Sequence, residues 1–407
     1  MTTQQVPGEK AGVDSGRAWL VVAAAFLGSA VTLGTVYSFG SFFDAMANDF
    51  GTGRGETAVV FGVTTFTFFW LSLVTGRLAD RFGPRPIMLL GAASILIGLF
   101  ATSQVQSITV GYVTYGLGAG LAGACAYIPM VATVGGWFER HRASAVGVAV
   151  AGIGVGTLVM NPLVTRLLAS YSWRTTFQII GVGGAAVLLV GALLVDRAPG
   201  AAGAAPSRFQ DAARSPLFRR LWIAALCSGM ILFVPFVFVA PYAKEGGVSD
   251  TAAAWLVGLL GGASVVSRIG FGTLSRRFGA FRLYRAGLVL FPLSYVIWLF
   301  AGSSYPALLL FVVVLGTGYG SFVAVSPLVL ADRFGVVGLG SLMGLFYTTQ
   351  GLGGLIGPPV AGRLIDQYGT YRVPMIIALV LGTISVAILA TVSTNAAGTL
   401  DPEPTSY

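Results

Sequence analysis

The sequence predicts an all-α membrane protein with twelve transmembrane helices in two six-helix bundles. Three observations predict this fold. The 407 residues are 55% hydrophobic and only 10% charged, whereas soluble domains carry about 25% charged residues. Apolar stretches of about 20 residues or more recur along the whole chain, and each is long enough to cross a hydrocarbon layer of about 30 Å. The two halves of the chain also repeat one another.

Hydropathy divides the chain into twelve predicted spans. The longest polar connection, residues 196–217, is rich in Ala, Gly, Pro and Arg, and we interpret it as a linker between the bundles. The domains are then a tail (1–16), a first bundle (17–195), the linker, a second bundle (218–395) and a second tail (396–407). The predicted spans are 17–43, 56–79, 86–104, 107–137, 143–169, 173–195, 218–243, 250–275, 283–302, 304–331, 340–365 and 371–394.

The basic residues gather on one side of these spans, and this asymmetry predicts the orientation of the chain. Cytoplasmic loops of membrane proteins carry an excess of Lys and Arg. Both tails and the linker fall on the basic side, so we expect both termini to be cytoplasmic. The net charge of +9 therefore indicates membrane orientation and no nucleic-acid partner. The basic residues expected on the opposite side are Arg54, Arg166, Arg174, Lys244, Arg363 and Arg372.

Composition also excludes several classes of function. The chain has one histidine and two cysteines, Cys125 and Cys227, which lie in separate apolar segments. These residues supply neither metal-ligand spacing nor a catalytic triad. The glycines follow no predicted strand, so a phosphate-binding loop is excluded. We therefore expect no metal, no cofactor and no enzyme activity.

An internal duplication supports the two-bundle plan. GRLADRFG (76–83) aligns with GTLSRRFG (272–279), and at nearly the same offset Arg166 aligns with Arg363. Two similar bundles in parallel orientation are typical of an alternating-access carrier, which holds its substrate between the bundles near the midplane.

Arg268 is the most informative residue of the second half. It is the only charged residue between Asp250 and Arg276, and the aligned position in the first half is Ser72. A cation at the bilayer centre costs about 2.5 kcal/mol or more, so it usually faces a wet cavity where it meets an anion. We predict that Arg268 binds a carboxylate through two parallel hydrogen bonds. Alternatively, its side chain extends to the cytoplasmic end of the helix, about 12 Å away.

Polar side chains in the middle of other spans are further candidates for substrate binding. A phenol combines apolar surface with a hydrogen-bond donor, which suits a small organic acid. For each tyrosine the alternative is a helix-packing role, and for the glutamine it is a hydrogen bond between helices. The candidates are Tyr37, Tyr127, Tyr319, Tyr347 and Gln350.

One loop carries a more specific signature. GRLADRFGPRP (76–86) resembles the segment between the second and third helices of the major facilitator superfamily. This resemblance implies the major facilitator fold, with a conformational latch between the bundles on the cytoplasmic face. The residues to which we assign the latch are Gly76, Asp80, Arg81, Gly83 and Arg85.

Three further segments resemble signatures of a narrower family. They are DSGRAW (14–19), WFERHRASAVGVAVAGIGVG (137–156), and PFVFVAPYAKEGG (235–247) followed by Arg268. These segments are similar to those of the monocarboxylate transporter family and its bacterial relatives, which include oxalate/formate antiporters. In that family the arginine of the eighth helix is taken to bind the substrate carboxylate, which implies this role for Arg268. The resemblance also implies a bacterial cytoplasmic membrane as the location.

The chain departs from the family pattern at informative positions. Animal members have a lysine in the first helix, where this chain has Tyr37, and an acid one turn before the eighth-helix arginine, where it has Ser264. That acid is linked to proton coupling, so the proton as a second partner stays open. Resemblance to the oxalate exchangers implies a second cation in the eleventh helix, but residues 347–350 supply none, which favours a monocarboxylate over a dicarboxylate.

These expectations describe a secondary transporter of a small monocarboxylate such as lactate or pyruvate, embedded in a lipid bilayer and active as a monomer. An exchanger of other organic anions of the oxalate/formate type and an exporter of hydrophobic drugs are the alternatives. Exporters of cationic drugs tend to carry an acid in the cavity, whereas no Asp or Glu lies in the middle of a predicted span. The acids nearest the outer mouth are Asp44, Asp49 and Glu56.

Overall fold

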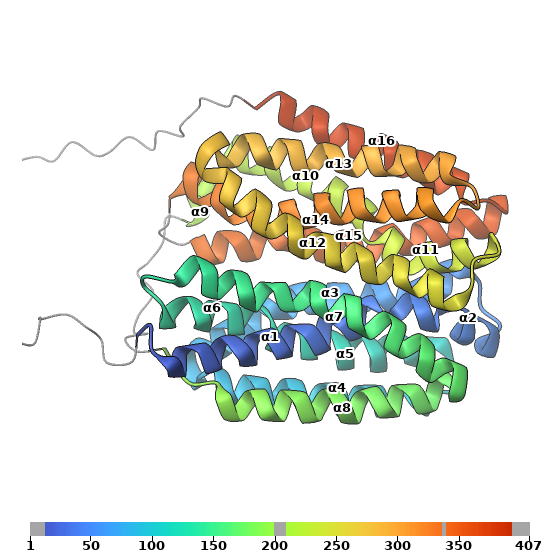
Figure 1. The fold of residues 1–407 in the computed structure, drawn as a ribbon, viewed down its shortest axis with the longest axis horizontal. Helices are drawn as coiled ribbons and strands as arrows, with labels where there is room; N and C mark the ends of the chain where they lie inside the picture. Colours follow the sequence, from blue (N-terminus) through green and yellow to red (C-terminus); the bar gives the residue numbers. More distant parts are fainter. Residues whose placement is uncertain (1–12, 199–208, 336–338, 393–407) are drawn as a thin grey trace, which may run out of the picture.

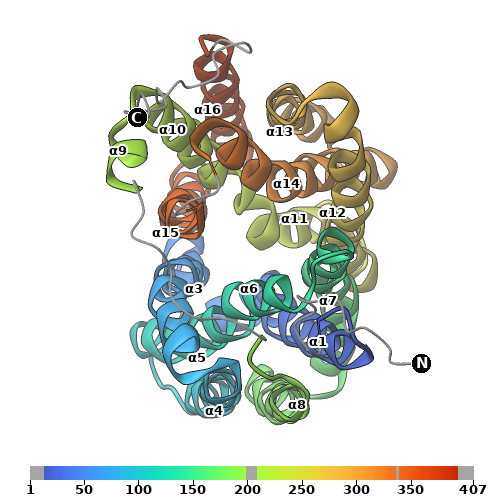
Figure 2. The same ribbon diagram turned by 90° about the vertical axis from the view of Figure 1, so that its left-hand side faces the viewer.

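The fold consists of long helices that lie side by side in two groups (Figure 1). The computed structural model describes residues 13–198, 209–335 and 339–392, which contain helices and no strand. The first group holds α1–α8 and the second α10–α16, and they meet mainly through α3 with α15 and α7 with α12 (Figure 2). The helices are α1 (Gly16–Tyr37), α2 (Phe39–Phe50), α3 (Arg54–Phe82), α4 (Pro84–Ser103), α5 (Ile108–Ala126), α6 (Ile128–Trp137), α7 (Arg142–Ser170), α8 (Trp173–Leu194), α9 (Phe209–Arg214), α10 (Pro216–Leu232), α11 (Val234–Glu245), α12 (Asp250–Phe278), α13 (Ala280–Ala301), α14 (Tyr305–Phe334), α15 (Leu339–Tyr368) and α16 (Arg372–Ala390).

The predicted all-α membrane fold is confirmed. Within the described residues, eleven spans are long and apolar enough to cross a membrane, and three of them are pairs of helices: α1 with α2, α5 with α6, and α10 with α11. α15 is a further helix of 30 residues that lies along α3 and α10, and its glycines and polar residues lower its hydropathy. Most predicted ends differ from the helix ends by a few residues. The largest difference is in the first span, which continues through α2 to Phe50 instead of ending at 43.

The breaks within the paired helices have local causes. Tyr127 separates α5 from α6 and is followed by Pro129. Phe233 separates α10 from α11 and is followed by Pro235. Proline has no N–H group and clashes with the preceding turn, so it interrupts a helix. At the third break, the Ser38 hydroxyl donates a hydrogen bond of 2.9 Å to a backbone carbonyl one turn earlier, and such bonds bend helices.

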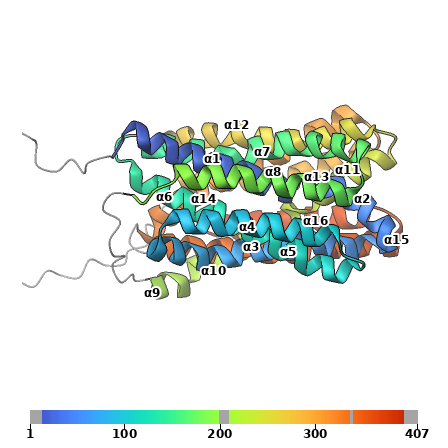
Figure 3. The ribbon, with the colours of Figure 1, turned by 90° about the horizontal axis from the view of Figure 1, so that it is seen from below.

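The start and the end of the helical region lie at the same end of the molecule. α1 begins and α16 ends near α9, at the left of Figure 1, and we call this the linker end. The opposite end carries α2 and is called the α2 end (Figure 3). The sequence did not predict α9 within the linker. Most of the predicted tail 1–16, the predicted tail 396–407 and residues 199–208 of the linker lie outside the described residues.

The repeated segment of the two halves ends its helix in the same way each time. Gly83 and Gly279 follow α3 and α12 with φ angles of 96° and 84°, in a region that glycine enters without steric cost. Each donates its N–H to the carbonyl oxygen four residues earlier, in Ala79 and Ser275. This shared geometry explains why glycine recurs at the end of both segments.

Glycines also allow neighbouring helices to approach closely within a bundle. A Cβ atom at Gly156 in α7 would overlap the backbone of Ala30 in α1. Membrane helices use small residues in this way because close van der Waals packing drives their association. The contact between α1 and α7 therefore depends on the absence of a side chain at Gly156.

Gly156→Ala is predicted to lower the melting temperature of the purified protein by a few degrees, since overpacking costs about 1–3 kcal/mol. Gly147→Ala is the matched control, because a Cβ atom at this position in the same helix meets nothing within 4 Å. The control should leave the melting temperature unchanged or raise it, because alanine favours helix. A thermal-shift measurement in detergent compares the variants, and equal melting temperatures would contradict this account of the packing.

Candidate functional site

Arg268 lies in α12 and its guanidinium contacts the first bundle. The residue is only 8% exposed. Its Nη1 donates a hydrogen bond of 2.6 Å to the carbonyl oxygen of Val150 in α7. Its Nε and Nη2 are buried and have no hydrogen-bond partner in the described part of the chain. The side chain therefore does not extend to the linker end, which was the alternative expected from the sequence.

Glycines bring α7 and α12 close enough for this contact. A Cβ atom at Gly154 would lie 2.5 Å from the carbonyl oxygen of Gly261, and one at Gly261 would lie 2.6 Å from Cβ of Thr157. Larger residues at either position would push the helices apart. Because Val150 lies one turn before Gly154, the close crossing places its carbonyl within reach of Arg268.

Tyr319 covers the guanidinium from α14. Its ring centroid lies 5.4 Å from Cζ of Arg268, within the range of a cation–π interaction. Gly316 and Gly320 flank this tyrosine, and a Cβ atom at either one would overlap the backbone of α12. Residues 316–320, GTGYG, thereby place the phenol ring on the arginine.

All four predicted tyrosines lie around Arg268. The hydroxyl oxygens of Tyr37 and Tyr319 are 3.2 Å apart and share a hydrogen bond between α1 and α14. Tyr127 and Tyr347 lie close enough for their phenols to interact electrostatically with the guanidinium. The five side chains come from α1, the α5–α6 break, α12, α14 and α15, so the cluster contains residues of both bundles.

Gln350 makes its described contacts elsewhere. Its Nε2 donates hydrogen bonds to the carbonyl oxygen of Ala225 in α10, at 3.2 Å, and to the Thr349 hydroxyl, at 3.3 Å. Since α10 and α15 belong to the same bundle, the amide links two helices of that bundle. This is the helix-packing role that the sequence left open for Gln350.

No carboxylate pairs with Arg268 in the part of the chain that the structure describes. The side chain one turn earlier in α12 is Ser264, which is fully buried and donates a hydrogen bond of 2.8 Å to the carbonyl of Gly261. The described groups around the guanidinium are therefore phenols and a backbone carbonyl, and no described acid neutralises its positive charge.

Charged residues join the two bundles at the α2 end. Lys244 in α11 forms an ion pair with Asp44 in α2, and Arg54 in α3 forms one with Glu245 in α11. The carboxylate of Asp366 in α15 accepts hydrogen bonds of 3.0 and 2.9 Å from two backbone N–H groups in the first turn of α3, where an anion is favoured. These contacts close the α2 end.

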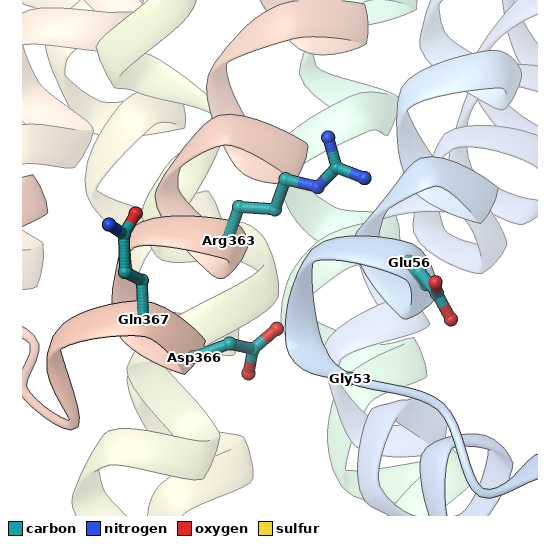
Figure 4. A pocket seen from close by; sticks show the side chains of 5 residues that line it. All are labelled: Gly53, Glu56, Arg363, Asp366 and Gln367. Atoms are coloured by element: carbon teal, nitrogen blue, oxygen red, sulfur yellow. The ribbon is translucent and has the colours of Figure 1, made fainter.

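A surface pocket of about 450 Å³ lies beside these contacts, between α3 and α15 (Figure 4). In Figure 4 the carboxylate of Asp366 faces the turn that begins α3, while Glu56 points away from it. This pocket lies at the α2 end and contains none of the side chains gathered around Arg268. Its lining residues are Gly53, Glu56, Arg363, Asp366 and Gln367.

An aromatic layer, defined as Tyr37, Phe61, Phe69, Phe233 and Phe236, joins the bundles between these ion pairs and Arg268. The ring centroids are 4.5 Å apart for Tyr37 and Phe236, and 5.9 Å apart for Phe61 and Phe233. Phe69 lies 6.4 Å from Phe233. Each of these contacts joins a helix of the first bundle to the second bundle.

The predicted latch residues lie at the linker end and do not bridge the bundles in this conformation. Among the described residues, every ion pair between the bundles lies at the α2 end. The backbone carbonyl of Arg81 instead accepts a hydrogen bond from Arg197, on the first-bundle side. The latch therefore stays a prediction for a conformation that is closed at the linker end. Its residues are Gly76, Asp80, Arg81, Gly83 and Arg85.

Two of the segments that resemble family signatures contact one another at the linker end. The carboxylate of Asp14 accepts hydrogen bonds from the backbone N–H groups of Glu139, Arg140 and His141. The bond from Arg140 is the main cause that lowers the pKa of Asp14 below its ordinary value, and burial opposes it. Asp14 thus ties the start of α1 to the turn between α6 and α7.

Comparison with known proteins identifies the family. The model of the Major Facilitator Superfamily matches residues 25–288 and 221–405. Monocarboxylate transporter 4 of Rattus norvegicus is 30% identical over 379 residues, which cover 90% of this chain and 80% of the relative. The chain belongs to the major facilitator superfamily and, within it, to the monocarboxylate transporter family. It is therefore a multi-pass membrane transporter and not an enzyme.

Other relatives and solved structures agree with this assignment. Monocarboxylate transporter 12 of Rattus norvegicus is 29% identical over 401 residues, which cover 88% of this chain and 82% of the relative. The structure of the nucleoside transporter NupG is similar with a TM-score of 0.73 at 15% identity, covering 92% of this chain and 99% of that one. A bacterial homologue of the lysosomal transporter Spinster, in an inward-facing and occupied conformation, is similar with a TM-score of 0.73 at 16% identity, covering 93% and 97%. At these identities the solved structures show the fold alone.

The contacts at the α2 end generate a prediction about closure. Lys244→Ala should make the carrier open more often at this end, because it removes the ion pair with Asp44. The measurement is the rate at which a membrane-impermeant maleimide labels Val237→Cys, in a variant whose native cysteines are replaced. We expect labelling to be up to about fivefold faster, since a partly exposed ion pair contributes about 0.2–1 kcal/mol.

A matched control is available at the same end. Arg174 in α8 pairs with Asp49 in α2, and both helices belong to the first bundle. Arg174→Ala therefore removes an ion pair of the same type without weakening the contact between the bundles, and it should leave the labelling rate unchanged. Equal rates in the Lys244→Ala and Arg174→Ala variants would show that the ion pair between the bundles does not hold the α2 end closed.

Proposed function

We propose that this carrier moves a small monocarboxylate, such as lactate or pyruvate, across the membrane by alternating access, and that Arg268 binds the carboxylate. The observation that supports this proposal most strongly is the state of the Arg268 side chain. It is buried, and two of its three nitrogens have no described partner. Burying an unpaired cation is unfavourable in free energy, so an anion that pairs with Arg268 binds with a large favourable free energy.

The unpartnered nitrogens define how the carboxylate binds. Nε and Nη2 form one edge of the planar guanidinium, whereas Nη1 is engaged by Val150. Two parallel N–H groups on one edge match the two oxygens of a carboxylate. The carboxylate is therefore bound side-on by Nε and Nη2, while Nη1 keeps its hydrogen bond to the first bundle.

The surroundings of Arg268 favour one carboxylate and an uncharged remainder of the substrate. Tyr319 and Tyr37 contribute aromatic surface together with hydroxyl groups. No described contact brings a second Lys or Arg to the guanidinium, which favours a monocarboxylate over a dicarboxylate. The relatives are named monocarboxylate transporters, which agrees with this substrate class. An exporter of cationic drugs is disfavoured because no acid accompanies Arg268.

The orientation of the carrier follows from its basic residues. The arginine-rich turns after α3, α6 and α12 lie at the linker end, which we assign to the cytoplasm by the positive-inside rule. Both termini are then cytoplasmic, and the α2 end faces outward. In this orientation the ion pairs and the aromatic layer hold the two bundles together on the outward side.

Transport then requires the carrier to close at the linker end and to open at the α2 end. Substrate from the cytoplasmic side pairs with Arg268, the linker end closes, and the contacts at the α2 end separate. Asp80 and Arg81 lie at the linker end and are the residues to which we assign the latch of the outward-facing conformation. The glycine-mediated crossing of α7 and α12 and the contact of α3 with α15 supply the surfaces about which the bundles rock.

Arg268→Ala should reduce uptake of labelled pyruvate into proteoliposomes by at least about a hundredfold, because it removes two charge-assisted hydrogen bonds worth about 1.5–3 kcal/mol each. Arg268→Lys keeps the charge but loses the planar edge, so its uptake should lie between the wild type and Arg268→Ala. Arg282→Ala is the control, since Arg282 is exposed at the linker end. Undiminished uptake by Arg268→Ala would rule out the assigned role.

The hydrogen bond between Tyr37 and Tyr319 generates a second prediction. Tyr37→Phe and Tyr319→Phe should each raise the KM for pyruvate about two- to tenfold, since a neutral hydrogen bond contributes about 0.5–1.5 kcal/mol. Because either change removes the same bond, the double variant should be little worse than each single variant. Uptake measured over a range of pyruvate concentrations tests this, and strictly additive effects would contradict a shared role.

A further inference from the structure

We infer that a second pocket, between α13 and α16, binds a phospholipid through its phosphate, and that the bound lipid stabilises the contact between the bundles at the α2 end. The pocket has a volume of about 360 Å³ and lies where α13 ends and α16 begins. It contains none of the side chains gathered around Arg268, and the inference does not depend on the proposed substrate. The lining residues are Tyr242, Leu299, Phe300, Gly302, Gly369, Thr370, Tyr371, Arg372 and Met375.

The pocket lies between two helices that pack closely further along their length. α13 and α16 run side by side at the top of Figure 1. Near the middle of both helices, a Cβ atom at Gly382 in α16 would lie 3.2 Å from Cβ of Pro292 in α13. At the α2 end, the pocket lies between Phe300 of α13 and Met375 of α16. The pocket is therefore at the level of the helix ends, where lipid head groups meet water.

Arg372 supplies the charge that a phosphate requires. It is the only charged residue in the described lining of the pocket, and its side chain is exposed. Its guanidinium forms no ion pair within the described residues, and a guanidinium binds phosphate through two parallel N–H groups. The Thr370 hydroxyl oxygen accepts a hydrogen bond of 3.2 Å from the backbone N–H of Arg372, which leaves the hydroxyl hydrogen for an anion.

Exposed apolar side chains extend from the pocket toward the middle of both helices. Phe300 is 81% exposed although it lines the pocket. Exposed apolar surface on a membrane helix contacts acyl chains, and a phosphate group at its end stays at the level of the head groups. A ligand with a phosphate and acyl chains therefore matches both parts of the surface, whereas a free phosphate matches one. The exposed apolar residues are Val289, Leu293, Val296 and Phe300 in α13, and Ile376, Ile377, Val380 and Ile384 in α16.

One wall of the pocket belongs to the contact between the bundles. The Tyr371 hydroxyl donates a hydrogen bond of 2.7 Å to Glu245 in α11, and Glu245 forms an ion pair with Arg54 of the first bundle. The centroid of the Tyr371 ring also lies 5.4 Å from Cζ of Arg54, within the range of a cation–π interaction. A lipid that fills the pocket holds Tyr371 in the position where it makes these contacts, and so favours closure of the α2 end.

The first test measures binding of phosphatidylglycerol to the full-length purified carrier in detergent by native mass spectrometry. Arg372→Gln should weaken the tightest binding event about three- to tenfold, because it removes a partly exposed, charge-assisted contact with the phosphate. Arg166→Gln is the matched control and should keep the wild-type affinity. Arg166 is an exposed arginine near the α2 end of α7 that lines neither pocket. Equal affinities in the two variants would overturn the inference.

Two further probes distinguish a phospholipid from its parts. Diacylglycerol with the same acyl chains lacks the phosphate, and glycerol 3-phosphate lacks the chains. We expect neither probe to compete with phosphatidylglycerol at the concentration at which the phospholipid saturates its site. Equal binding of diacylglycerol would show an apolar surface without a phosphate site, and competition by glycerol 3-phosphate would show a site for a soluble phosphate. Either result would overturn the inference.

The effect on the α2 end is tested by maleimide labelling of the Val237→Cys carrier. Added phosphatidylglycerol should slow labelling about two- to fivefold, since it stabilises a contact comparable to a partly exposed ion pair. In a Tyr371→Phe background the lipid should still bind, because the ring remains, but it should slow labelling less, because the hydrogen bond to Glu245 is lost. Phosphatidylglycerol that binds to the wild-type pocket without slowing labelling would overturn the stabilising role. None of these measurements depends on transport of pyruvate.

Discussion

The burial of an unpaired arginine is the constraint on which the rest of this structure depends. Arg268 needs partners that the membrane cannot supply, and the surrounding helices give it a carbonyl oxygen at Val150 and the face of Tyr319. Both contacts require helices that approach closely, which explains the glycines at the crossing of α7 with α12 and on either side of Tyr319. The edge formed by Nε and Nη2 has no described partner, and we propose that an anion binds there. Packing and binding chemistry are thus linked through one residue.

The two ends of the molecule differ in how the bundles contact one another, because the described ion pairs between the bundles lie at the α2 end. At the α2 end, Lys244, Arg54 and Asp366 join the bundles through ion pairs and a helix N-terminus. Such contacts are partly exposed and individually weak, so they can separate without a large barrier. Near the candidate site, the aromatic layer packs the two bundles together, with ring centroids 4.5–6.4 Å apart. Closure that is weak at the surface and tight near the site suits a carrier that must alternate.

The sequence predicted the fold and the cluster around Arg268 because both depend on signals carried by residue type. Apolar runs of membrane length predicted the spans, and a lone charge in one of them predicted the candidate site. The break at Tyr127 was not predicted, since the apolar run continues across it while the backbone changes direction. The partner of Arg268 could not be predicted, because a backbone carbonyl such as that of Val150 leaves no mark on the sequence. Ion pairs between the bundles, such as that of Asp44 with Lys244, could not be predicted either, because they depend on how two segments far apart in the sequence meet in the fold. The sequence allowed Gln350 either to contact substrate or to link two helices, and its described hydrogen bonds link two helices.

The most direct test of the central claim is an experimental structure of the carrier with bound pyruvate in a lipid nanodisc. The account predicts the two carboxylate oxygens at about 2.7–2.9 Å from Nε and Nη2 of Arg268, with Nη1 still bonded to the carbonyl of Val150. Pyruvate bound elsewhere, with this edge of the guanidinium left unpaired, would contradict it.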